Sequence, residues 1–314
     1  MIANGEILYV LSDVRSGSTL LDQLLGAHPE ILSLGELHWL PAYVREDREL
    51  YNPVHPLVCA CGEPVTTCAF WKEVSAAMSQ PLDSLQLRPK YFRWRGQGSD
   101  KNRLGARIAY LPRRFIQRYP ATFMHPVVQR FFGGPALVRD SLSLADAIFK
   151  VSGNRYIVDS SKSSFRFRTM YDRQPNRVRA VVLVRDYRAV VHSKLKRGQT
   201  LKGAAIGWRR TMLQIGAHTA GLSSEHGYRL KYEALCEDPE RELRRICDFL
   251  DLEFTPAMLQ RPTQDVHHIG GSPSKFDPSR VAISLDTTYQ GAFEPDELDE
   301  LRDLVGNVAE SWGY

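Results

Sequence analysis

One stretch near the start of the chain limits the folds that this sequence can adopt. Residues 7–11 form a short apolar run between small polar residues, which predicts a buried parallel strand. Leucines at positions 20, 21, 24 and 25 recur at helical spacing, so a helix is expected to begin near Ser18. A strand, a short turn and a helix are the unit from which α/β sheets are built, and we therefore predict an α/β fold.

The turn between this strand and this helix has the features of an anion-binding site. It contains Arg15, Ser16 and Gly17, and it runs into Ser18 and Thr19 at the start of the helix. Unpaired N–H groups and the positive end of the helix dipole converge there, while glycine permits close approach. The hydroxyls and the arginine add further donors. An ordinary capped turn has a similar composition, so this motif alone leaves both interpretations open.

A second buried strand ends in residues that suit another anion. The valine-rich run 178–184 leads directly into Arg185, and Ser193 and Arg197 follow on the next predicted helix. Because Ser193 and Arg197 are four residues apart, we expect them on one helix face. With Arg185 they would hold a phosphate through charge-assisted hydrogen bonds. A charged surface helix does not explain an arginine at the end of a buried strand.

One more charged residue is expected near the same edge of the sheet. Glu36 lies one strand–helix–strand step beyond Arg15, and the strand-like run 156–159 ends in polar residues that include Lys162. Consecutive parallel strands end at one edge of a sheet, which would bring Glu36 beside the anion-binding turn. A glutamate in a first helical turn is also an ordinary partner of the helix dipole, and that is the simpler interpretation of Glu36 alone.

The length of 314 residues is sufficient for the core of one large domain. Residues 49–150 lack a repeating strand–helix pattern, so we interpret them as a helical and loop insertion within a single domain, 1–314. No apolar run is long enough to span a bilayer, and no signal-peptide pattern opens the sequence. We therefore expect a cytoplasmic protein from a bacterial-type setting.

The net charge of +5 is concentrated in one segment. Residues 88–118 contain ten Lys or Arg and one acid, Asp100, whereas the remainder has 31 basic and 35 acidic residues, a balance of −4. Such a segment suits an anionic acceptor, a membrane surface or a nucleic acid. A solvated or oligomer-facing helical region has the same composition. We predict no nucleic-acid partner, and we leave membrane-surface contact and a homodimer open.

Three of the five cysteines are clustered. Cys59, Cys61 and Cys68 lie within ten residues, and with His55 they offer four ligands for zinc. The spacing is not typical of a zinc finger, so we favour a reduced, packed loop and predict no metal requirement. A zinc site and a disulfide remain alternatives. Cys236 and Cys247 lie in helical patterns and are expected to be core residues.

In their order along the chain, these motifs resemble those of sulfotransferases that use 3′-phosphoadenosine 5′-phosphosulfate (PAPS). The match extends over most of the chain outside roughly 85–150. The run Arg15 to Thr19 resembles the family's 5′-phosphosulfate loop, and Arg185 with Ser193 resembles its 3′-phosphate motif. Tyr232 resembles the tyrosine at the nucleotide end of the donor.

The resemblance also implies a fold and further donor contacts. The fold would be P-loop-like, with three α/β/α layers around a central, mostly parallel sheet. The loop 270–276 resembles the C-terminal segment that covers the nucleotide. By this resemblance, Ser272, Ser274 and Lys275 would contact the donor.

Within the superfamily, the sequence is most similar to the branch of tyrosylprotein sulfotransferases and bacterial carbohydrate or small-molecule sulfotransferases. The segment that carries Glu36 resembles that branch's general-base segment, Lys162 resembles its strand-end lysine, and Arg197 matches an additional phosphate ligand. The resemblance implies in-line sulfuryl transfer, with Glu36 accepting the acceptor's proton. Arg15, Lys162 and Ser193 would complete the catalytic set, and no metal ion would be required.

The implied acceptor is a hydroxyl of a carbohydrate, a lipid or a small molecule. Residues 49–150 would bind it, and the basic segment within them suits an anionic acceptor. Peptide tyrosine is an alternative, but Leu37 and His38 stand where the tyrosylprotein enzymes carry an arginine.

Two other functional classes remain open at this point. A P-loop kinase or NTPase would use Asp159 to hold magnesium, although the turn after the first strand lacks the Gly-Lys-Ser/Thr of a Walker A motif. A non-catalytic anion- or nucleic-acid-binding module would use the basic segment. His28, His38, His267 and His268 are alternative bases, and we expect structural roles for them.

Overall fold

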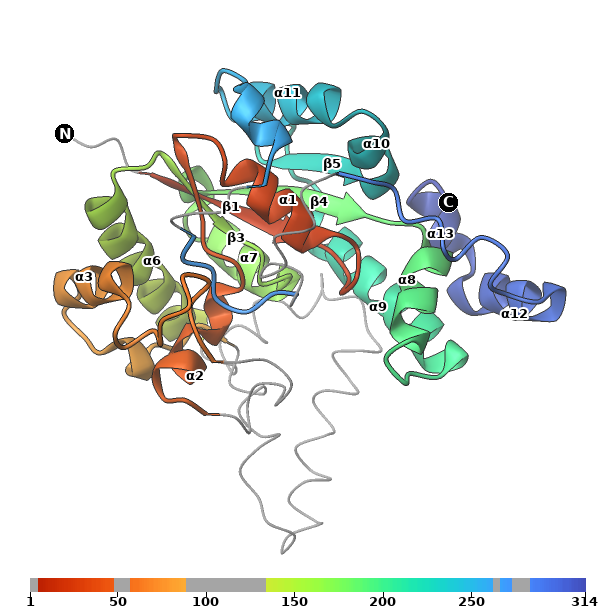
Figure 1. The fold of residues 1–314 in the computed structure, drawn as a ribbon, viewed down its shortest axis with the longest axis horizontal. Coiled ribbons are helices and arrows are strands. Elements are labelled where there is room, and N and C mark those ends of the chain that lie inside the picture. Colours follow the sequence, from red (N-terminus) through yellow and green to blue (C-terminus); the bar gives the residue numbers. More distant parts are fainter. Residues whose placement is uncertain (1–4, 48–56, 89–133, 262–265, 273–282) are drawn as a thin grey trace, which may run out of the picture.

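A five-stranded sheet with every pair of strands parallel forms the centre of the molecule (Figure 1). The computed structural model describes residues 5–47, 57–88, 134–261, 266–272 and 283–314. The strand order is β2-β3-β1-β4-β5. The strands are β1 (Glu6–Leu11), β2 (Ile31–Ser33), β3 (Tyr156–Asp159), β4 (Val178–Val184) and β5 (Gly227–Lys231).

Strand β1 is the central strand, and its side chains divide between two apolar cores. Ile7, Tyr9 and Leu11 belong to one buried cluster, whereas Leu8 and Val10 belong to the other. This division follows from the alternation of side chains along a strand. Because both faces are covered, the strand reads as a continuous apolar run in the sequence. The predicted three-layer α/β/α fold is therefore confirmed.

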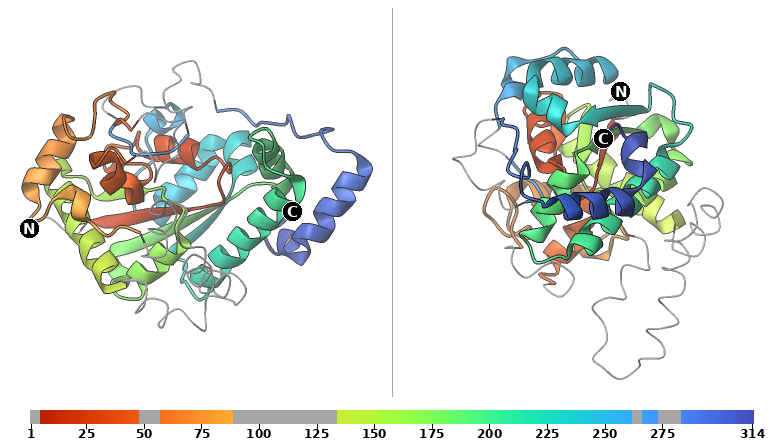
Figure 2. Two further views of the ribbon diagram at one scale, coloured as in Figure 1. Left: turned by 90° about the horizontal axis from the view of Figure 1, so that it is seen from below. Right: turned by 90° about the vertical axis from the view of Figure 1, so that its right-hand side faces the viewer.

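The helices of the two outer layers pack on these two cores. Residues of α1, α10 and α11 enter the core that contains Leu8, and the other large helices enter the core that contains Ile7. Figure 2 shows α9 and α12 running side by side at one edge. The α-helices are α1 (Ser18–Leu25), α2 (Leu40–Val44), α3 (Ala69–Ala77), α6 (Gly134–Ser152), α7 (Ser164–Tyr171), α8 (Tyr187–Leu195), α9 (Leu201–Thr219), α10 (Tyr232–Glu237), α11 (Pro239–Phe249), α12 (Pro295–Val305) and α13 (Asn307–Ser311).

Some expected helices differ in extent. The chain after Glu36 begins as a 3-10 turn, η1 (Leu37–Trp39), and only then continues as the short α2. The sequence predicts a C-terminal helix from about 295 to 310, but this helix is broken at Gly306, whose φ of 57° separates α12 from α13. The remaining 3-10 turns are η2 (Leu82–Ser84), η4 (Pro175–Arg177) and η5 (Pro256–Leu259).

The described parts of 49–150 pack against the α/β core. The sequence predicts a helix near 141–150, and the observed α6 is longer because Leu137 and Val138 extend its buried face. It contacts α3, and Trp71 of α3 is fully buried in the same core. The basic segment beyond Arg88, in which the sequence predicts a helix near 103–118, lies outside the described residues. Within the described ranges, no helix combines the length and the apolar character needed to cross a bilayer.

Candidate active site

The loop after β1 forms the predicted anion-binding turn. Its backbone takes left-handed conformations at Arg15 (φ 74°) and Gly17 (φ 89°), and α1 begins at Ser18. A Cβ atom on Gly17 would lie 2.4 Å from Cδ2 of Tyr232, so glycine is required there for both conformation and space. Turns of this kind direct successive N–H groups towards an anion.

A buried ion pair anchors this loop to the neighbouring helices. The carboxylate of Asp13 accepts a hydrogen bond from the buried ammonium of Lys194 on α8. It also accepts hydrogen bonds from the N–H of Val14 at 2.8 Å and the hydroxyl of Thr211 on α9 at 3.4 Å. Our sequence analysis missed these residues. The available signal was an acid directly after a buried strand, but its lysine partner lies 181 positions away.

The two predicted anion motifs meet at Arg15. Nε of Arg15 donates a hydrogen bond to Oγ of Ser193 at 3.0 Å, and Nη1 of Arg185 donates to the carbonyl of Arg15 at 3.2 Å. The Arg185 guanidinium lies over the ring of Tyr232, 4.4 Å from its centroid. Four residues predicted from separate motifs therefore lie together at one edge of the sheet.

Arg185 is held by an acid that the sequence analysis did not identify. Its Nη2 donates to Oδ2 of Asp286 at 3.2 Å and to the carbonyl of Asp286 at 3.3 Å. Burial acts to raise the pKa of Asp286, but hydrogen bonds from Thr288 and the charge of Arg185 outweigh it and hold this pKa at about 2. Asp286 is therefore a carboxylate at every physiological pH, and it occupies the place expected for an anionic ligand of Arg185.

The expectation that Arg197 shares a helix face with Ser193 is wrong. Helix α8 ends at Leu195, and Arg197 lies in the following turn with an exposed side chain. The backbone tightens there, since the N–H groups of Arg197 and Gly198 bond to carbonyls only three residues earlier. Gly198 then takes a left-handed φ of 80°, which is a common way to end a helix. A phosphate contact of Arg197 stays a prediction.

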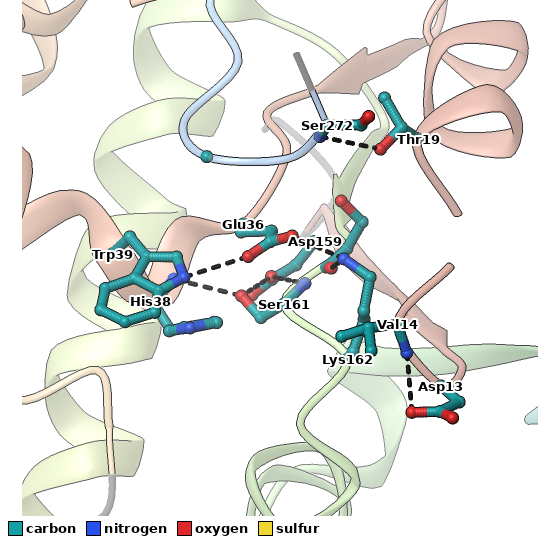
Figure 3. A network of polar contacts seen from close by, with 12 residues as sticks. Asp13, Val14, Thr19, Glu36, His38, Trp39, Asp159, Ser161, Lys162 and Ser272 are labelled. Carbon is teal, nitrogen blue, oxygen red and sulfur yellow. Dashed lines mark hydrogen bonds and ion pairs between the residues drawn. The ribbon is translucent and has the colours of Figure 1, made fainter. Parts of the chain in front are cut away.

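Glu36 and Lys162, which are 126 positions apart, form an ion pair beside this loop. Nζ of Lys162 lies 2.6 Å from Oε1 of Glu36, and the side chains are only 13% and 17% exposed. The indole N–H of Trp39 donates to the other carboxylate oxygen of Glu36 at 3.0 Å. Figure 3 shows Lys162 and Trp39 approaching the carboxylate from opposite sides. Both oxygens of Glu36 are thus engaged, and Trp39 is a contact that spacing alone did not predict.

The backbone around Glu36 is fixed by a segment from the far end of the chain. The N–H of Glu36 donates to the carbonyl of Ile269 at 2.6 Å, and the N–H of Ile269 donates to the carbonyl of Leu34 at 2.8 Å. A Cβ atom on Gly35 (φ 73°) would lie 2.4 Å from that Ile269 carbonyl. Gly35 therefore permits two strand-like segments to pass closely enough to hold Glu36 in position.

The lysine partner is held by the end of β3. Lys162 takes a left-handed φ of 59°, and its ammonium also donates to the carbonyl of Ser160 at 3.2 Å. The preceding Asp159 is fully buried and accepts hydrogen bonds from Arg166 and Ser161. Both Asp159 oxygens are used by protein groups, so this acid supports the turn that presents Lys162.

A loop near the C-terminus covers the anion-binding turn. The N–H of Ser272 donates to Oγ1 of Thr19 at 3.3 Å (Figure 3). Ser16 and Ser18 are buried beneath the turn surface. The predicted donor contacts Ser274 and Lys275 lie outside the described residues.

The histidines considered as alternative bases occupy structural positions. Nε2 of His28 contacts the carbonyl of Glu253 at 2.9 Å, and Nε2 of His268 contacts the Ser33 hydroxyl at 2.5 Å. Burial, followed by the charge of Arg88, lowers the pKa of His38 well below its ordinary value. His267 lies against the cysteine cluster, beside Cys59 and Cys68. The predicted partner of that cluster, His55, is outside the described residues.

The residues of this edge suit an anion with two charged ends. At one end, Nε of Arg185 is buried and has no hydrogen-bond partner among the described residues, so it can donate to a bound ligand. At the other end, the Lys162–Glu36 pair places a cation and a potential proton acceptor together. The loop between them presents backbone N–H groups at a helix N-terminus. This arrangement suits an anionic ligand that lies beside a carboxylate–ammonium pair.

Comparison with known proteins defines the class. Residues 8–256 match the model of the sulfotransferase family, which is most of the chain. The chain therefore belongs to the sulfotransferase family. This range includes most of β1, all of β2 to β5 and the residues of the Lys162–Glu36 pair.

Individual relatives are more distant. The chain is 27% identical over 136 residues to a putative protein-tyrosine sulfotransferase of Caenorhabditis briggsae, and 27% identical over 139 residues to that of Caenorhabditis elegans. Each alignment covers 40% of this chain. It covers 49% of the Caenorhabditis briggsae protein and 52% of the Caenorhabditis elegans protein, so the chain spans about half the length of these relatives. Among solved structures, the sulfotransferase domain from the curacin biosynthetic pathway matches with a TM-score of 0.51 at 19% identity. The structural alignment covers 95% of this chain and 96% of that domain, and it shows that the two share a fold.

Proposed function

We propose that this protein transfers the sulfuryl group of PAPS to a hydroxyl group of an acceptor, with Glu36 as the general base. The observation that carries the proposal is the Lys162–Glu36 pair, with Nζ 2.6 Å from Oε1, at the edge where the anion-binding loop begins α1. A carboxylate can take the proton of an acceptor hydroxyl, and an adjacent ammonium can stabilise negative charge on the group that is transferred.

The residues present fit the donor. Tyr232 lies against Gly17 and beneath Arg185, so its ring offers a surface for the nucleotide. Arg185 has a buried Nε without a partner among the described residues, and Ser193 lies within hydrogen-bond distance of Arg15. These groups would hold the 3′-phosphate and would distinguish PAPS from ATP. The hydroxyls of Ser18 and Thr19 and the loop N–H groups would hold the 5′-phosphate.

PAPS supplies an activated sulfuryl group on its 5′-phosphate. In the proposed step a bond forms between the acceptor oxygen and sulfur, the bond between sulfur and the 5′-phosphate oxygen breaks, and the acceptor proton passes to Glu36. Lys162 and Arg15 would stabilise the negative charge on the transferring group and on the leaving oxygen. Trp39 would keep Glu36 oriented through its hydrogen bond to Oε2. The cationic side chains supply the charge stabilisation that a metal ion would otherwise supply.

The structure provides a pocket that suits an acceptor. A pocket of about 170 Å³ lies beside η1, and its lining includes His38, Arg45, Arg88 and Arg139. The Arg88 guanidinium lies 3.6 Å from the ring centroid of Trp39, the residue that bonds to Glu36. The pocket lies between the segment that follows the proposed base and the insertion. Its lining has three arginines against one acid, Asp140, and this balance favours an acceptor that carries negative charge. Carbohydrate, lipid and small-molecule alcohols or phenols fit this description, with peptide tyrosine as the alternative.

The buried environment of Asp159 argues against a magnesium-dependent kinase. Its oxygens accept hydrogen bonds from Arg166 and from Ser161, and its side chain is inaccessible. A carboxylate in this state offers no oxygen to a hydrated magnesium ion.

The test is incubation of the protein with labelled PAPS and an extract rich in metabolites, followed by identification of the labelled product. We expect product from the unaltered protein, and a loss of rate on the order of 10²–10⁴-fold for Glu36→Gln. Glu36→Gln should bind 3′-phosphoadenosine 5′-phosphate (PAP) as the unaltered protein does. The exposed Glu73→Gln is the matched control and should keep full activity. Unchanged turnover of Glu36→Gln would place the base elsewhere.

A further inference from the structure

The clustered cysteines and one histidine converge on a common point. One ligand atom each from Cys59, Cys61, Cys68 and His267 lies within 4.8 Å of the other three. Sγ of Cys68 is 3.6 Å from Sγ of Cys61, 3.9 Å from Sγ of Cys59 and 3.4 Å from Nδ1 of His267. Tetrahedral zinc, with Zn–S bonds of about 2.3 Å, places sulfur ligands about 3.8 Å apart and sulfur and nitrogen about 3.6 Å apart. The three separations from Sγ of Cys68 are close to these edges.

Local backbone structure presents the cysteines to this point. The N–H of Gly62 donates to the carbonyl of Cys59 at 2.9 Å, and the N–H of Cys59 donates to the carbonyl of Glu63 at 2.8 Å. Gly62, directly after Cys61, has a φ of 95°, so the chain turns tightly just after the first two cysteines. Cys68 is the N-cap of α3, where the helix dipole favours a negatively charged sulfur.

The histidine is brought to the cluster from a distant segment and is held there. Its Nδ1 lies 3.7 Å from Sγ of Cys59, 208 positions away in the sequence. The imidazole stacks on Phe70 with a centroid separation of 4.8 Å and an interplanar angle of 10°. Next to it, the N–H of Ala60 donates to the carbonyl of His268 at 3.1 Å. Neither a packed apolar loop nor a disulfide explains an imidazole directed at three thiols.

We propose that Cys59, Cys61, Cys68 and His267 bind one zinc ion with a structural role. Three sulfurs in contact repel one another once they lose their protons, and a divalent cation removes that cost. Thiolate and imidazole ligands in a tetrahedral set are those that zinc prefers, and four protein ligands leave no open position for catalysis. This site is separate from the proposed sulfuryl transfer and does not depend on it.

The ion would fix the segment that holds the proposed base. Directly after His267, His268 contacts the buried Ser33, and Ile269 accepts the hydrogen bond from the N–H of Glu36. Zinc would therefore join the loop 59–68 to this segment and restrict its motion. Loss of zinc should loosen the backbone at Glu36 more than at the sheet interior.

The first test is the metal content of the full chain, purified without chelators and kept reduced. We expect one zinc per chain by inductively coupled plasma mass spectrometry. After replacement of zinc by cobalt(II), we expect d–d absorption bands in the visible range and thiolate charge-transfer bands in the near ultraviolet. The exposed Cys61→Ser should still fold, and we expect its zinc affinity to fall on the order of 100-fold or more. His267→Ser should show a similar loss, whereas Cys236→Ser and His55→Ser should keep one zinc.

The second test measures amide hydrogen exchange before and after zinc removal. We expect faster exchange at Ala60, Glu36 and Ile269, whose N–H groups bond within this region, and little change in β4. A chain that purifies and refolds without zinc, with three reactive thiols, would overturn the proposal, as would iron in place of zinc or a Cys61–Cys68 disulfide. Zinc retained in His267→Ser but lost in His55→Ser would overturn the assignment of the fourth ligand.

Discussion

The two ends of the proposed donor site are built differently. At the transfer end, Glu36 is engaged on both oxygens by Lys162 and Trp39, and its backbone is fixed by a second segment. At the nucleotide end, Arg185 is paired with Asp286, whose side chain is 46% exposed. We propose that the transfer end is preorganised by these contacts, whereas the nucleotide end holds a protein carboxylate where the proposal places a phosphate.

From this difference we infer that the transfer end determines the rate of sulfuryl transfer and that the nucleotide end determines which donor binds. A preorganised base and cation reduce the cost of reaching the transition state. An exposed carboxylate is a weak partner that a phosphate with more charge can displace. Substitutions at the transfer end should therefore change the rate of transfer, and substitutions at the nucleotide end should change the affinity for the donor.

The largest effect is expected at Lys162. Lys162→Met removes the ammonium but keeps the length of the side chain, and loss of one charge-stabilising donor typically lowers kcat about 10²–10³-fold. The affinity for PAP should change little, because PAP lacks the transferring group. Single-turnover kinetics and calorimetric titration measure the two quantities, with the exposed Lys150→Met as control. A parallel loss of PAP affinity would mean that Lys162 belongs to the nucleotide end.

Arg185 should affect affinity instead. Arg185→Gln removes charged hydrogen bonds worth about 1.5–3 kcal/mol each, so PAP binding should weaken roughly 10- to 100-fold. Binding of 5′-AMP, which has no 3′-phosphate, should be unchanged, and the exposed Arg209→Gln should alter neither. Equal weakening for PAP and 5′-AMP would contradict the assignment of Arg185 to the 3′-phosphate.

Trp39 offers a smaller test of the transfer end. Trp39→Phe keeps an aromatic ring in the core but removes the hydrogen bond of 3.0 Å to Glu36. Because the base loses orientation and not its charge, we expect kcat to fall roughly three- to tenfold, as one hydrogen bond of about 1 kcal/mol implies. PAP affinity measured in parallel should stay constant. A fall as large as that of Glu36→Gln would show that Trp39 does more than orient the base.

The smallest effect is expected at Asp286. Asp286→Asn removes the carboxylate that competes for Arg185, so PAP should bind up to about fivefold more tightly, in line with exposed ion pairs. The pKa of Asp286 is about 2 in the folded protein, below its ordinary 3.8. The ionised carboxylate therefore contributes its full stabilisation of the fold above pH 3.8, and this contribution is lost as the pH falls towards 2. The gain in affinity should therefore be the same at pH 6 and pH 8. Weaker PAP binding in Asp286→Asn would mean that Asp286 orients Arg185 and does not compete for it.

The sequence alone was sufficient for the sheet and for the local motifs. The run 178–184 forms a strand with those limits, and Gly17 lies in the predicted turn with a positive φ. Both features depend only on a few neighbouring residues, so a local pattern is sufficient to predict them. The position of Glu36 at the edge of the sheet follows from the rule that parallel strands end at one edge, but its ion pair with Lys162 was not predicted.

Contacts between distant segments were beyond such rules. Asp286 reaches Arg185 across 101 positions, and His267 reaches Cys59 across 208, and no local pattern encodes either contact. The shared helix face of Ser193 and Arg197 was wrong for a different reason, since α8 ends at Leu195 and Gly198 turns the chain away. Tertiary packing determines the two long-range contacts, and the end of α8 determines the position of Arg197.

The most direct test of the account is whether the 3′-phosphate determines which nucleotide stabilises the protein. At a concentration one hundred times its Kd, PAP should raise the free energy of unfolding by about 2.7 kcal/mol, measured by denaturant titration. Magnesium-ATP at the same concentration should raise it much less, because it offers no 3′-phosphate to Arg185 and Ser193. Equal stabilisation by the two nucleotides would contradict the account.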